Sequence, residues 1–376
     1  MKRHTVSARA ARVHCEAFVV DLHADTPSEF FLEAGYDFGA RNTRGHVDLP
    51  RLREGGVDAE FMIAWVPADL AAEPGASFAH AMRLVEAVHE VAARTPGTRV
   101  ATSAAQVEAA REAGEVALLI GVEGGHALED SLDALRQFYR AGVRYLTLTW
   151  NNTNGWADAC CTPPRHGGLS EFGREVVREM NRLGMLVDVS HAADTTLADV
   201  LEVSKAPILA SHSCARALAE HPRNLTDEQA RQIARRGGVI GVNFFPGFLD
   251  ARYGAAYDAL AAEAEARERA AAEAGEDRER ARREASAWLR SRMEALEPVP
   301  VSRLLDHLDH LVKVAGPDHV ALGSDFDGVA TLPSGIRDVS DLPLITELLL
   351  ERGHSERDVA KILGGNVLRL LREVTG

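Results

Sequence analysis

Eight short apolar runs, separated by segments with helical periodicity, restrict the fold of this chain more than any other feature. Strands this apolar are typical of parallel sheets whose two faces are both covered by helices. Eight strand–helix units within 376 residues predict an α/β fold, a (β/α)8 barrel of the TIM type. The predicted strands are 19–27, 59–67, 116–124, 144–150, 185–191, 207–213, 239–245 and 319–328.

A doubly wound open sheet is the alternative arrangement of alternating strands and helices. It is disfavoured, because no glycine-rich phosphate-binding pattern follows the first strand. No internal repeat or flexible linker marks a boundary, so residues 1–376 are predicted to form a single domain. The predicted helices are 45–56, 77–94, 131–140, 171–184, 193–204, 226–237, 302–316 and 355–374.

Residues 251–296 do not fit the eight-fold pattern. They are dominated by Ala, Glu and Arg, a composition that favours helix and places Glu and Arg at helical spacing. Because the segment follows the seventh strand, it should emerge from the face of the barrel that carries the active site. It is either a solvated helical insertion or a lid or dimer contact, anchored in the latter case by Trp288, Leu289 and Met293.

Composition excludes several classes of partner. The net charge is −14 and no basic stripe is present, so a nucleic-acid partner is not expected. No apolar run approaches the ~18 residues of a transmembrane helix, and residues 1–18 lack the apolar stretch of a secretory signal. A cytoplasmic protein without a membrane partner is therefore expected.

The four cysteines do not form a recognisable framework. They lack the CxxC spacing of zinc and redox motifs. Two of them are adjacent, an arrangement that suits neither an ordinary disulfide nor a zinc knuckle. The four are Cys15, Cys160, Cys161 and Cys214.

Residues that bind metals gather at the carboxyl ends of five predicted strands. His23 and Asp25 lie two apart on the first strand and so point to the same side, although a buried His–Asp pair is also a common structural element. The whole set is harder to explain as core packing, because each buried polar group would need its own partner. One or two shared cations satisfy them together. The set is His23, Asp25, Glu123, His191, His212 and Asp325.

Nitrogen and oxygen ligands without cysteine suit Zn²⁺ with open coordination positions. Two neighbouring cations need a bridging anion. The lysines of the chain do not lie at strand ends, so Glu123 is the available bridge. A hydroxide shared by the two cations, its pKa lowered by them, would be the nucleophile.

Dispersed motifs between about residues 17 and 374 resemble the membrane (renal) dipeptidase family of metallopeptidases. They are VVDLHADTP, LLIGVEGGHAL, GVRYLTLTW, GLSEFGREVVREMNRLGMLVDVSH, APILASHS, HPRNL, DHLDHLVKVAG and LGSDFDGV. The resemblance implies an amidohydrolase-type barrel with two Zn²⁺ ions. By the same resemblance, His23, Asp25 and Glu123 hold one ion, and Glu123, His191 and His212 hold the other.

The resemblance also assigns two residues outside the metal centre. Asp325 is expected to transfer a proton from the hydroxide to the leaving amine, whereas a capping role is more natural for Asp327. Arg223 is expected to bind the terminal carboxylate of the substrate, a bidentate task that suits Arg. The alternatives are a loop role for Asp325 and a surface position for Arg223.

One position departs from the family pattern. Renal-type members have a His after LTLT that contacts the substrate carbonyl oxygen, and here that position is Trp150, followed by Asn151. Tryptophan offers a single N–H and no charge. Trp150 and Asn151 are predicted substrate contacts, and His126 or His166 is a candidate to replace the missing His. The departure bears on the substrate range more than on hydrolysis.

The resulting prediction is a zinc-dependent dipeptidase that acts on small dipeptides, including those with a C-terminal D-residue, and that forms a homodimer as its family implies. Two alternatives remain open. One is another amidohydrolase activity, such as N-acyl amino acid or lactone hydrolysis, and the other is a catalytically silent zinc-binding homologue. The remaining histidines that we interpret as structural are His46, His80, His89, His307 and His310.

Overall fold

The strands close into a parallel barrel. The computed structural model describes residues 5–275 and 277–376, and in these residues nine strands form one sheet in the order β2-β1-β9-β8-β7-β6-β5-β4-β3. β2 also pairs with β4, which closes a ring of eight strands and leaves β3 outside it. The predicted barrel is confirmed. The strands are β1 (Val20–Ala24), β2 (Ala59–Trp65), β3 (Thr98–Val100), β4 (Val116–Glu123), β5 (Val143–Thr147), β6 (Leu186–Asp188), β7 (Leu209–Ala210), β8 (Val239–Val242) and β9 (Val320–Leu322).

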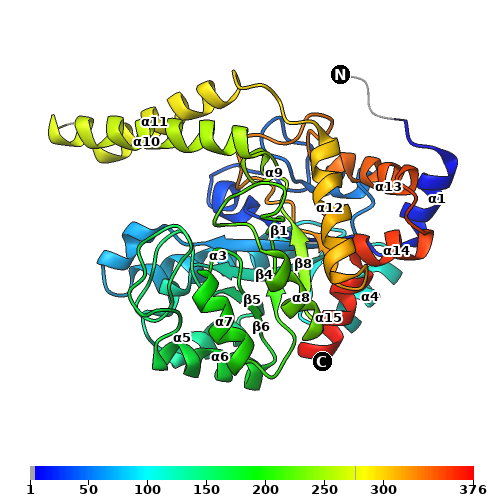
Figure 1. The fold of residues 1–376 in the computed structure, drawn as a ribbon, viewed down its shortest axis with the longest axis horizontal. Helices are drawn as coiled ribbons and strands as arrows, with labels where there is room; N and C mark the ends of the chain where they lie inside the picture. Colours follow the sequence, from blue (N-terminus) through cyan, green and yellow to red (C-terminus); the bar gives the residue numbers. More distant parts are fainter. Residues whose placement is uncertain (1–4, 276) are drawn as a thin grey trace.

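Helices follow the strands and form the outer layer of the barrel (Figure 1). Each predicted helix is present in some form, and α1, α4, α9 and α13 are additional. The helices are α1 (Ala8–Glu16), α2 (Leu49–Glu54), α3 (Ala76–Arg94), α4 (Ala104–Glu112), α5 (Leu132–Arg140), α6 (Glu171–Leu183), α7 (Asp194–Val203), α8 (Asp227–Arg235), α9 (Pro246–Leu249), α10 (Ala251–Glu273), α11 (Arg278–Met293), α12 (Val301–Ala315), α13 (Leu342–Glu351), α14 (Glu356–Ala360) and α15 (Asn366–Val374). Short turns of 3-10 or π-helix are η1 (Pro27–Phe31), η2 (Ala68–Ala72), η3 (Gly125–Leu128), η4 (Val339–Asp341) and η5 (Lys361–Gly365).

The last predicted helix is interrupted. Residues 355–374 form α14, the π-turn η5 and α15 rather than one regular helix. The cause is a close approach at Gly364, where a Cβ atom would overlap the carbonyl oxygen of Phe18 and the amide nitrogen of Val20. A glycine is therefore needed where this helix crosses the start of β1.

The strands are buried on both faces, as their continuous apolar composition predicts. All eight residues of β4 are buried, and so are all residues of β2 except Trp65. Two polar residues interrupt this interior below the cavity, Asp21 on β1 and Glu60 on β2, which lie opposite each other in register. The polar end of the barrel is thus supported by an otherwise apolar core.

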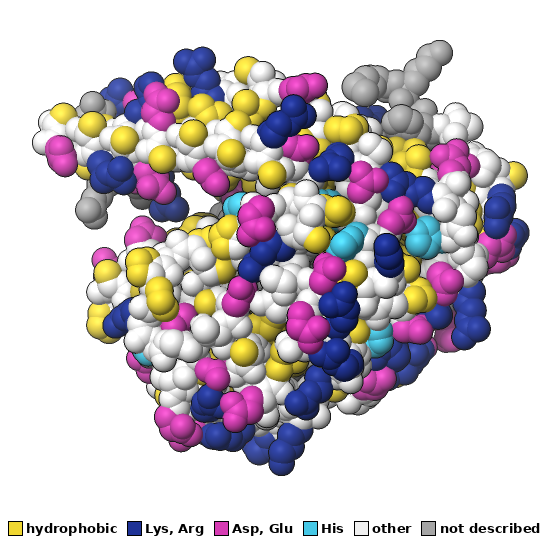
Figure 2. Space-filling model, viewed as in Figure 1, with side chains coloured by type: hydrophobic (Ala, Val, Ile, Leu, Met, Phe, Trp, Pro, Cys, Tyr) yellow, Lys and Arg dark blue, Asp and Glu magenta, His cyan; other side chains and the backbone are white. Residues whose placement is uncertain are grey.

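The segment 251–296 forms a helical hairpin, α10 and α11, which lie side by side and project over the barrel (Figure 1). At its base, the Tyr253 hydroxyl is 2.8 Å from the hydroxyl of Thr331. Arg282 lies 3.6 Å from Asp69 on the opposite rim. A hollow separates the hairpin from the barrel below (Figure 2). The hairpin therefore spans the mouth of the barrel.

Candidate metal centre and substrate cavity

A cavity of about 560 Å³ lies at the carboxyl ends of the barrel strands. The barrel contributes predicted site residues to its wall, and the hairpin contributes the opposite wall. Of the three predicted hairpin anchors, Leu289 and Met293 line the cavity. Trp288 instead packs within the hairpin, beneath the guanidinium groups of Arg267 and Arg292 at 4.2 and 5.6 Å from its ring centroid. The lid interpretation therefore fits the structure better than a purely solvated insertion.

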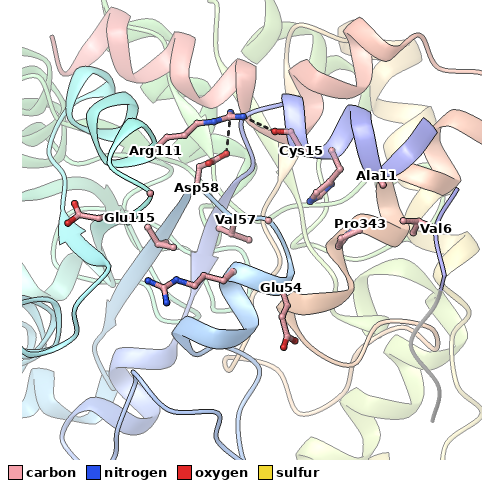
Figure 3. Close-up of a pocket in the computed structure, with 14 residues that line it drawn as sticks. Val6, Ala11, Cys15, Glu54, Val57, Asp58, Arg111, Glu115 and Pro343 are labelled. Carbon is pink, nitrogen blue, oxygen red and sulfur yellow. Dashed lines mark hydrogen bonds and ion pairs between the residues drawn. The ribbon is translucent and has the colours of Figure 1, made fainter. Parts of the chain in front are cut away.

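A second cavity, of about 570 Å³, lies near the amino-terminal ends of β2 and β4 (Figure 3). Its most prominent side chain is Arg111, which donates to the carbonyl oxygen of Cys15 at 2.8 Å and pairs with Asp58 at 3.4 Å. These charged groups hold α1 against the barrel.

Glu123 stands between three imidazoles at the floor of the first cavity. Its Oε2 atom faces His23, 3.8 Å from Nε2. Its Oε1 atom lies 3.0 Å from Nε2 of His191 and 3.4 Å from Nε2 of His212. Asp25 adds a carboxylate oxygen 3.4 Å from His23 Nε2. The five predicted ligands thus converge, with Glu123 in the position that a bridging carboxylate requires.

The donor atoms of this cluster fit a cation. His23 Nε2, Asp25 Oδ1 and Glu123 Oε1 are buried and have no hydrogen-bond partner among the described residues. Such buried polar atoms are costly unless something else satisfies them. Two sets of three donors lie within 4.8 Å of one another: His23, Glu123 and His212, and His23, Asp25 and Asp325. The second set contains Asp325, to which the sequence analysis assigned proton transfer.

Each imidazole is held by a partner on its other ring nitrogen, which leaves Nε2 directed at the cluster. This support fixes the orientation of the ring, as in many metal sites. Asn151, a predicted substrate contact, takes part in it while also lining the cavity. The pairs are His23 Nδ1 with Tyr145 Oη at 2.8 Å, His191 Nδ1 with Asn151 Oδ1 at 2.9 Å, and His212 Nδ1 with Ser211 Oγ at 2.7 Å.

Backbone geometry after the strands also contributes. His191 and Asp325 lie beyond the regular ends of β6 and β9, and both have a positive φ, of 67° and 63°. Residues other than glycine seldom adopt this conformation, and it clusters at functional sites. The turn directs both side chains back over the end of the barrel.

Electrostatics of the cluster favour a cation. Burial lowers the pKa of His191 and of His212, and the positive charges of Arg223 and His23 lower both further. Burial also opposes a charge on His23, but Glu123 and Asp25 outweigh it and raise the pKa of His23 to about 10. Burial raises the pKa of Glu123. A cation at this position would favour the ionised form of Glu123 against the effect of burial.

Asp325 is fixed close to the cluster. Its Oδ2 atom accepts a hydrogen bond from Asn243 Nδ2 at 2.9 Å, and its amide donates to the carbonyl oxygen of His23 at 3.0 Å. Burial, together with the charge of Asp25, raises the pKa of Asp325. Gly328 is essential to this packing, because a Cβ atom there would overlap the carboxylates of both Asp25 and Asp325.

Asp327 has a different role from Asp325. Its carboxylate accepts hydrogen bonds from the Thr26 hydroxyl at 2.7 Å and from the His46 amide at 2.5 Å. It therefore ties together the loops after β1 and β9, which is the structural role predicted for it.

Arg223 is in the cavity wall and only 4% exposed. Its Nη2 atom donates to the carbonyl oxygen of His212 at 3.2 Å, and its guanidinium lies 5.2 Å from the ring centroid of Phe248. Its Nε atom is buried without a partner among the described residues. This is the geometry of an arginine that is held in place and retains donors for an anion, not of a surface arginine.

Trp150 lines the cavity and packs edge-on against Trp65, with ring centroids 5.2 Å apart. Neither histidine predicted as a substitute lines this cavity. His126 faces a different cavity, beside Asn152, and His166 Nε2 is 3.1 Å from the carbonyl oxygen of Asn154. The structure therefore brings neither histidine into the wall of the cavity that Trp150 lines.

Sequence reasoning missed the supporting residues. Tyr145, Ser211 and Asn243 could have been recognised from the sequence, because each is a polar residue within a predicted apolar strand. A polar group on a buried strand needs a partner, and in these three positions the partner is a site residue.

A sequence model of the membrane dipeptidase family, peptidase family M19, matches residues 7–376. The chain belongs to this family. Among curated relatives, mouse dipeptidase 3 is 34% identical over 365 residues, which is 95% of this chain and 64% of that protein. Human dipeptidase 3 is 33% identical, over 95% of this chain and 65% of that protein. The chain thus spans slightly less than two thirds of the length of these relatives.

Solved structures of family members have the same fold. A probable dipeptidase, PvdM from Pseudomonas aeruginosa, superimposes with a TM-score of 0.82 at 27% identity, over 98% of each chain. A metallopeptidase from Rhodobacter sphaeroides, bound to a phosphinate mimic of the dipeptide L-Ala-D-Ala, has a TM-score of 0.77 at 27% identity, over 95% of this chain and 99% of that one.

Proposed function

We propose that this protein is a zinc-dependent dipeptidase with two metal ions in the first cavity. The observation that carries the proposal is the position of Glu123, whose Oε2 atom is nearest to His23 and whose Oε1 atom is nearest to His191 and His212. A carboxylate so placed is suited to bridge two cations. His23 and Asp25 would complete one site, and His191 and His212 the other. Two Zn²⁺ ions in this cluster would polarise a carbonyl group and acidify a water for use as the nucleophile.

The protein's own residues would bind the substrate and move the proton. Arg223 would bind the terminal carboxylate with the donors it retains, which places the scissile carbonyl between the guanidinium and Glu123. Asp325 has a raised pKa and a fixed orientation, so it can hold a proton and donate it to the leaving amine. The Asn243 hydrogen bond leaves Asp325 Oδ1 free for that transfer.

The hairpin would limit the length of the substrate. Tyr257, Leu289 and Met293 of the hairpin line the cavity, whose volume of about 560 Å³ accommodates a dipeptide. The Rhodobacter relative carries a mimic of L-Ala-D-Ala. We extend this to the present chain as a preference that includes dipeptides with a C-terminal D-residue.

The experiment is a panel of L-Xaa-L-Xaa and L-Xaa-D-Xaa dipeptides offered to zinc-reconstituted protein, with zinc counted in the same sample. The expected result is turnover with close to two zinc ions per chain. Asp325→Asn is the matched variant: it should keep most of its zinc and lose kcat by roughly a hundredfold or more. Turnover that is unchanged in this variant would remove Asp325 from the mechanism.

The same panel separates the alternatives. Zinc binding without turnover of any dipeptide, but with turnover of an N-acyl amino acid or a lactone, would mean that Trp150 marks a change of substrate. Zinc binding without any turnover would mean a silent homologue.

The cytoplasmic location and the homodimer remain predictions. In the described part of the chain, no helix combines the length and apolarity needed to cross a membrane.

A further inference from the structure

Two adjacent thiols stand beside the substrate cavity. Cys160 and Cys161 belong to the loop that follows β5, and their sulfur atoms are 3.3 Å apart and unbridged. Cys161 is exposed and lines the cavity, whereas Cys160 is half-buried. The proposed reaction uses neither residue, so it assigns no function to these two thiols.

The surroundings make Cys161 the more reactive thiol. The hydrogen bond shared with Cys160, followed by the positive charge of Arg223, lowers the pKa of Cys161 to about 7 against the opposing effect of burial. The thiolate is the nucleophilic form of cysteine, and low-pKa exposed thiols are the ones that peroxides oxidise. Cys160 provides a second thiol within reach.

A disulfide between neighbouring residues is easily reduced. Consecutive Cα atoms are about 3.8 Å apart, which is less than the roughly 4.4–6.8 Å of ordinary disulfides. The strain makes the bond more oxidising and therefore labile, a property of regulatory rather than structural disulfides. Cys160 and Cys161 are adjacent in the sequence, which does not suit an ordinary structural disulfide but is compatible with a reversible one.

We propose that Cys160 and Cys161 form an oxidative modification site in the wall of the substrate cavity, where a hydroperoxide closes them into a reversible vicinal disulfide. The Cys161 thiolate attacks the peroxide O–O bond to give a sulfenic acid, and the hydroperoxide is reduced to water or alcohol. The Cys160 thiol then attacks the Cys161 sulfur, forms the S–S bond and releases water. Two electrons pass from the thiols to the peroxide, and a dithiol reverses the change.

The segment that carries the thiols is attached to the metal centre. The Cys160 amide donates to the carbonyl oxygen of His191 at 2.8 Å, and Ala159 forms a β-bridge with Ala192. On the other side, Thr162 is held by the Thr153 amide at 2.8 Å. Because both flanks are held, closing the ring must displace either the His191 backbone or the cavity wall at Cys161. The effect on catalysis rests on the proposed dipeptidase function, but the modification itself does not.

The first test is by mass. Zinc-loaded protein is treated with stoichiometric hydrogen peroxide, alkylated and digested, and the peptide with residues 160 and 161 is expected to have lost two hydrogen atoms and to resist alkylation. Dithiothreitol should restore both thiols. Cys160→Ser should prevent the cross-link and leave a Cys161 sulfenic acid that a dimedone probe captures, while the exposed-thiol control Cys15→Ser should cross-link as the wild type does. The proposal would be overturned if Cys160 and Cys161 both gained oxygen atoms and formed no cross-link. It would also be overturned if Cys15 were oxidised before either of them reacted.

The second test concerns the cavity. Each protein is compared with its own untreated sample, and oxidised wild type is expected to lose at least threefold in kcat/KM, with recovery after reduction and zinc replacement. Cys160→Ser should show no such reversible loss. Zinc release to a chelating dye is measured in parallel and should accelerate on oxidation if the His191 backbone moves. A cross-link that changes neither kcat/KM nor the rate of zinc release would refute the coupling to the cavity, and the zinc-release measurement does not require a dipeptide substrate.

Discussion

The two cavities of this protein differ by little in volume, about 560 and 570 Å³, but they differ sharply in how their polar atoms are satisfied. At the carboxyl ends of the strands, Asp25, Glu123 and Arg223 all have buried polar atoms without partners among the described residues. At the amino-terminal ends, no described residue of the cavity wall has such an atom. Volume therefore does not distinguish the two cavities, whereas the unpartnered polar atoms in their walls do.

The difference follows from barrel architecture. The carboxyl ends of parallel strands receive loops that can carry function, and the amino-terminal ends carry contacts that stabilise the fold. Arg111 illustrates the second role. It donates to the carbonyl oxygens of Ala17 and Cys15 at 2.6 and 2.8 Å and stacks on the Phe18 ring at 4.3 Å. Its donors are already used for closing the fold.

The largest expected effect is that of Glu123→Gln, which tests whether the first cavity depends on a bridging carboxylate. An amide supplies no negative charge, so the protein should lose at least one metal ion and roughly a thousandfold or more in kcat/KM. Metal content by mass spectrometry and circular dichroism are measured together. Full activity with an intact metal content would place the bridge elsewhere.

Tyr145→Phe should have the next largest effect. It removes the hydroxyl that holds His23 Nδ1 at 2.8 Å without changing the ring that packs in the barrel. Loss of such a support typically costs about 10–100-fold in metal affinity. Competition with a chelator of known affinity measures it. A loss of thermal stability without any change in metal affinity would show that the Tyr145 hydroxyl stabilises the core and does not support the metal centre.

Arg111→Ala tests the opposite cavity. We expect a loss of about 1–2 kcal/mol in the free energy of unfolding, because the carbonyl oxygens of Ala17 and Cys15 lose a hydrogen-bond donor and Asp58 loses its ion pair. The kcat and KM values of the folded enzyme should not change. Arg111→Lys is the control, since it keeps the charge but not the forked donors. A fall in kcat/KM without a fall in stability would contradict the contrast between the cavities.

The smallest expected effect concerns His14, which lies in the wall of the second cavity with Nδ1 2.7 Å from the Thr346 hydroxyl and Nε2 2.8 Å from the Gly55 carbonyl oxygen. Burial lowers the pKa of His14 in the folded state. The unfolded chain therefore binds a proton more readily below its pKa of about 6.5, and stability falls as the pH falls through that value.

The measurement compares urea unfolding of the zinc-loaded wild type and of His14→Gln at pH 7.5 and 5.5. The wild type should lose about 1 kcal/mol more than the variant on acidification. The metal-centre histidines are present in both proteins, so their contribution cancels. An equal loss in the two proteins would mean that His14 titrates normally.

The sequence predicted the barrel because buried parallel strands have a composition that few other structures share. It did not predict β3, because a strand of three residues is too short to show periodicity. The predicted strand 207–213 also shortens to a two-residue β7, since the chain turns toward His212 soon after the ladder ends. Local pattern therefore located the strands but not their limits.

Within the site, residue type located the ligands because several metal-binding side chains rarely gather at strand ends by chance. The direction in which a loop side chain points could not be predicted from the sequence. His126 and His166 have the right chemistry and nearby positions in the sequence, but the loops turn both away from the cavity. Side chains that act through another residue, such as Tyr145, depend on contacts across the barrel, which sequence spacing does not contain.

The junction between β1 and β9 has a consequence for how the protein is made. Asp21 pairs with Leu322, so the first and last strands of the ring are neighbours although nearly the whole chain separates them. During synthesis, all five predicted ligands are complete well before β9 leaves the ribosome, yet they cannot surround an ion until that strand closes the ring. In the proposed metal centre, loading would then be a late event in biogenesis, and a bound ion would report a closed barrel rather than the mere presence of its ligands.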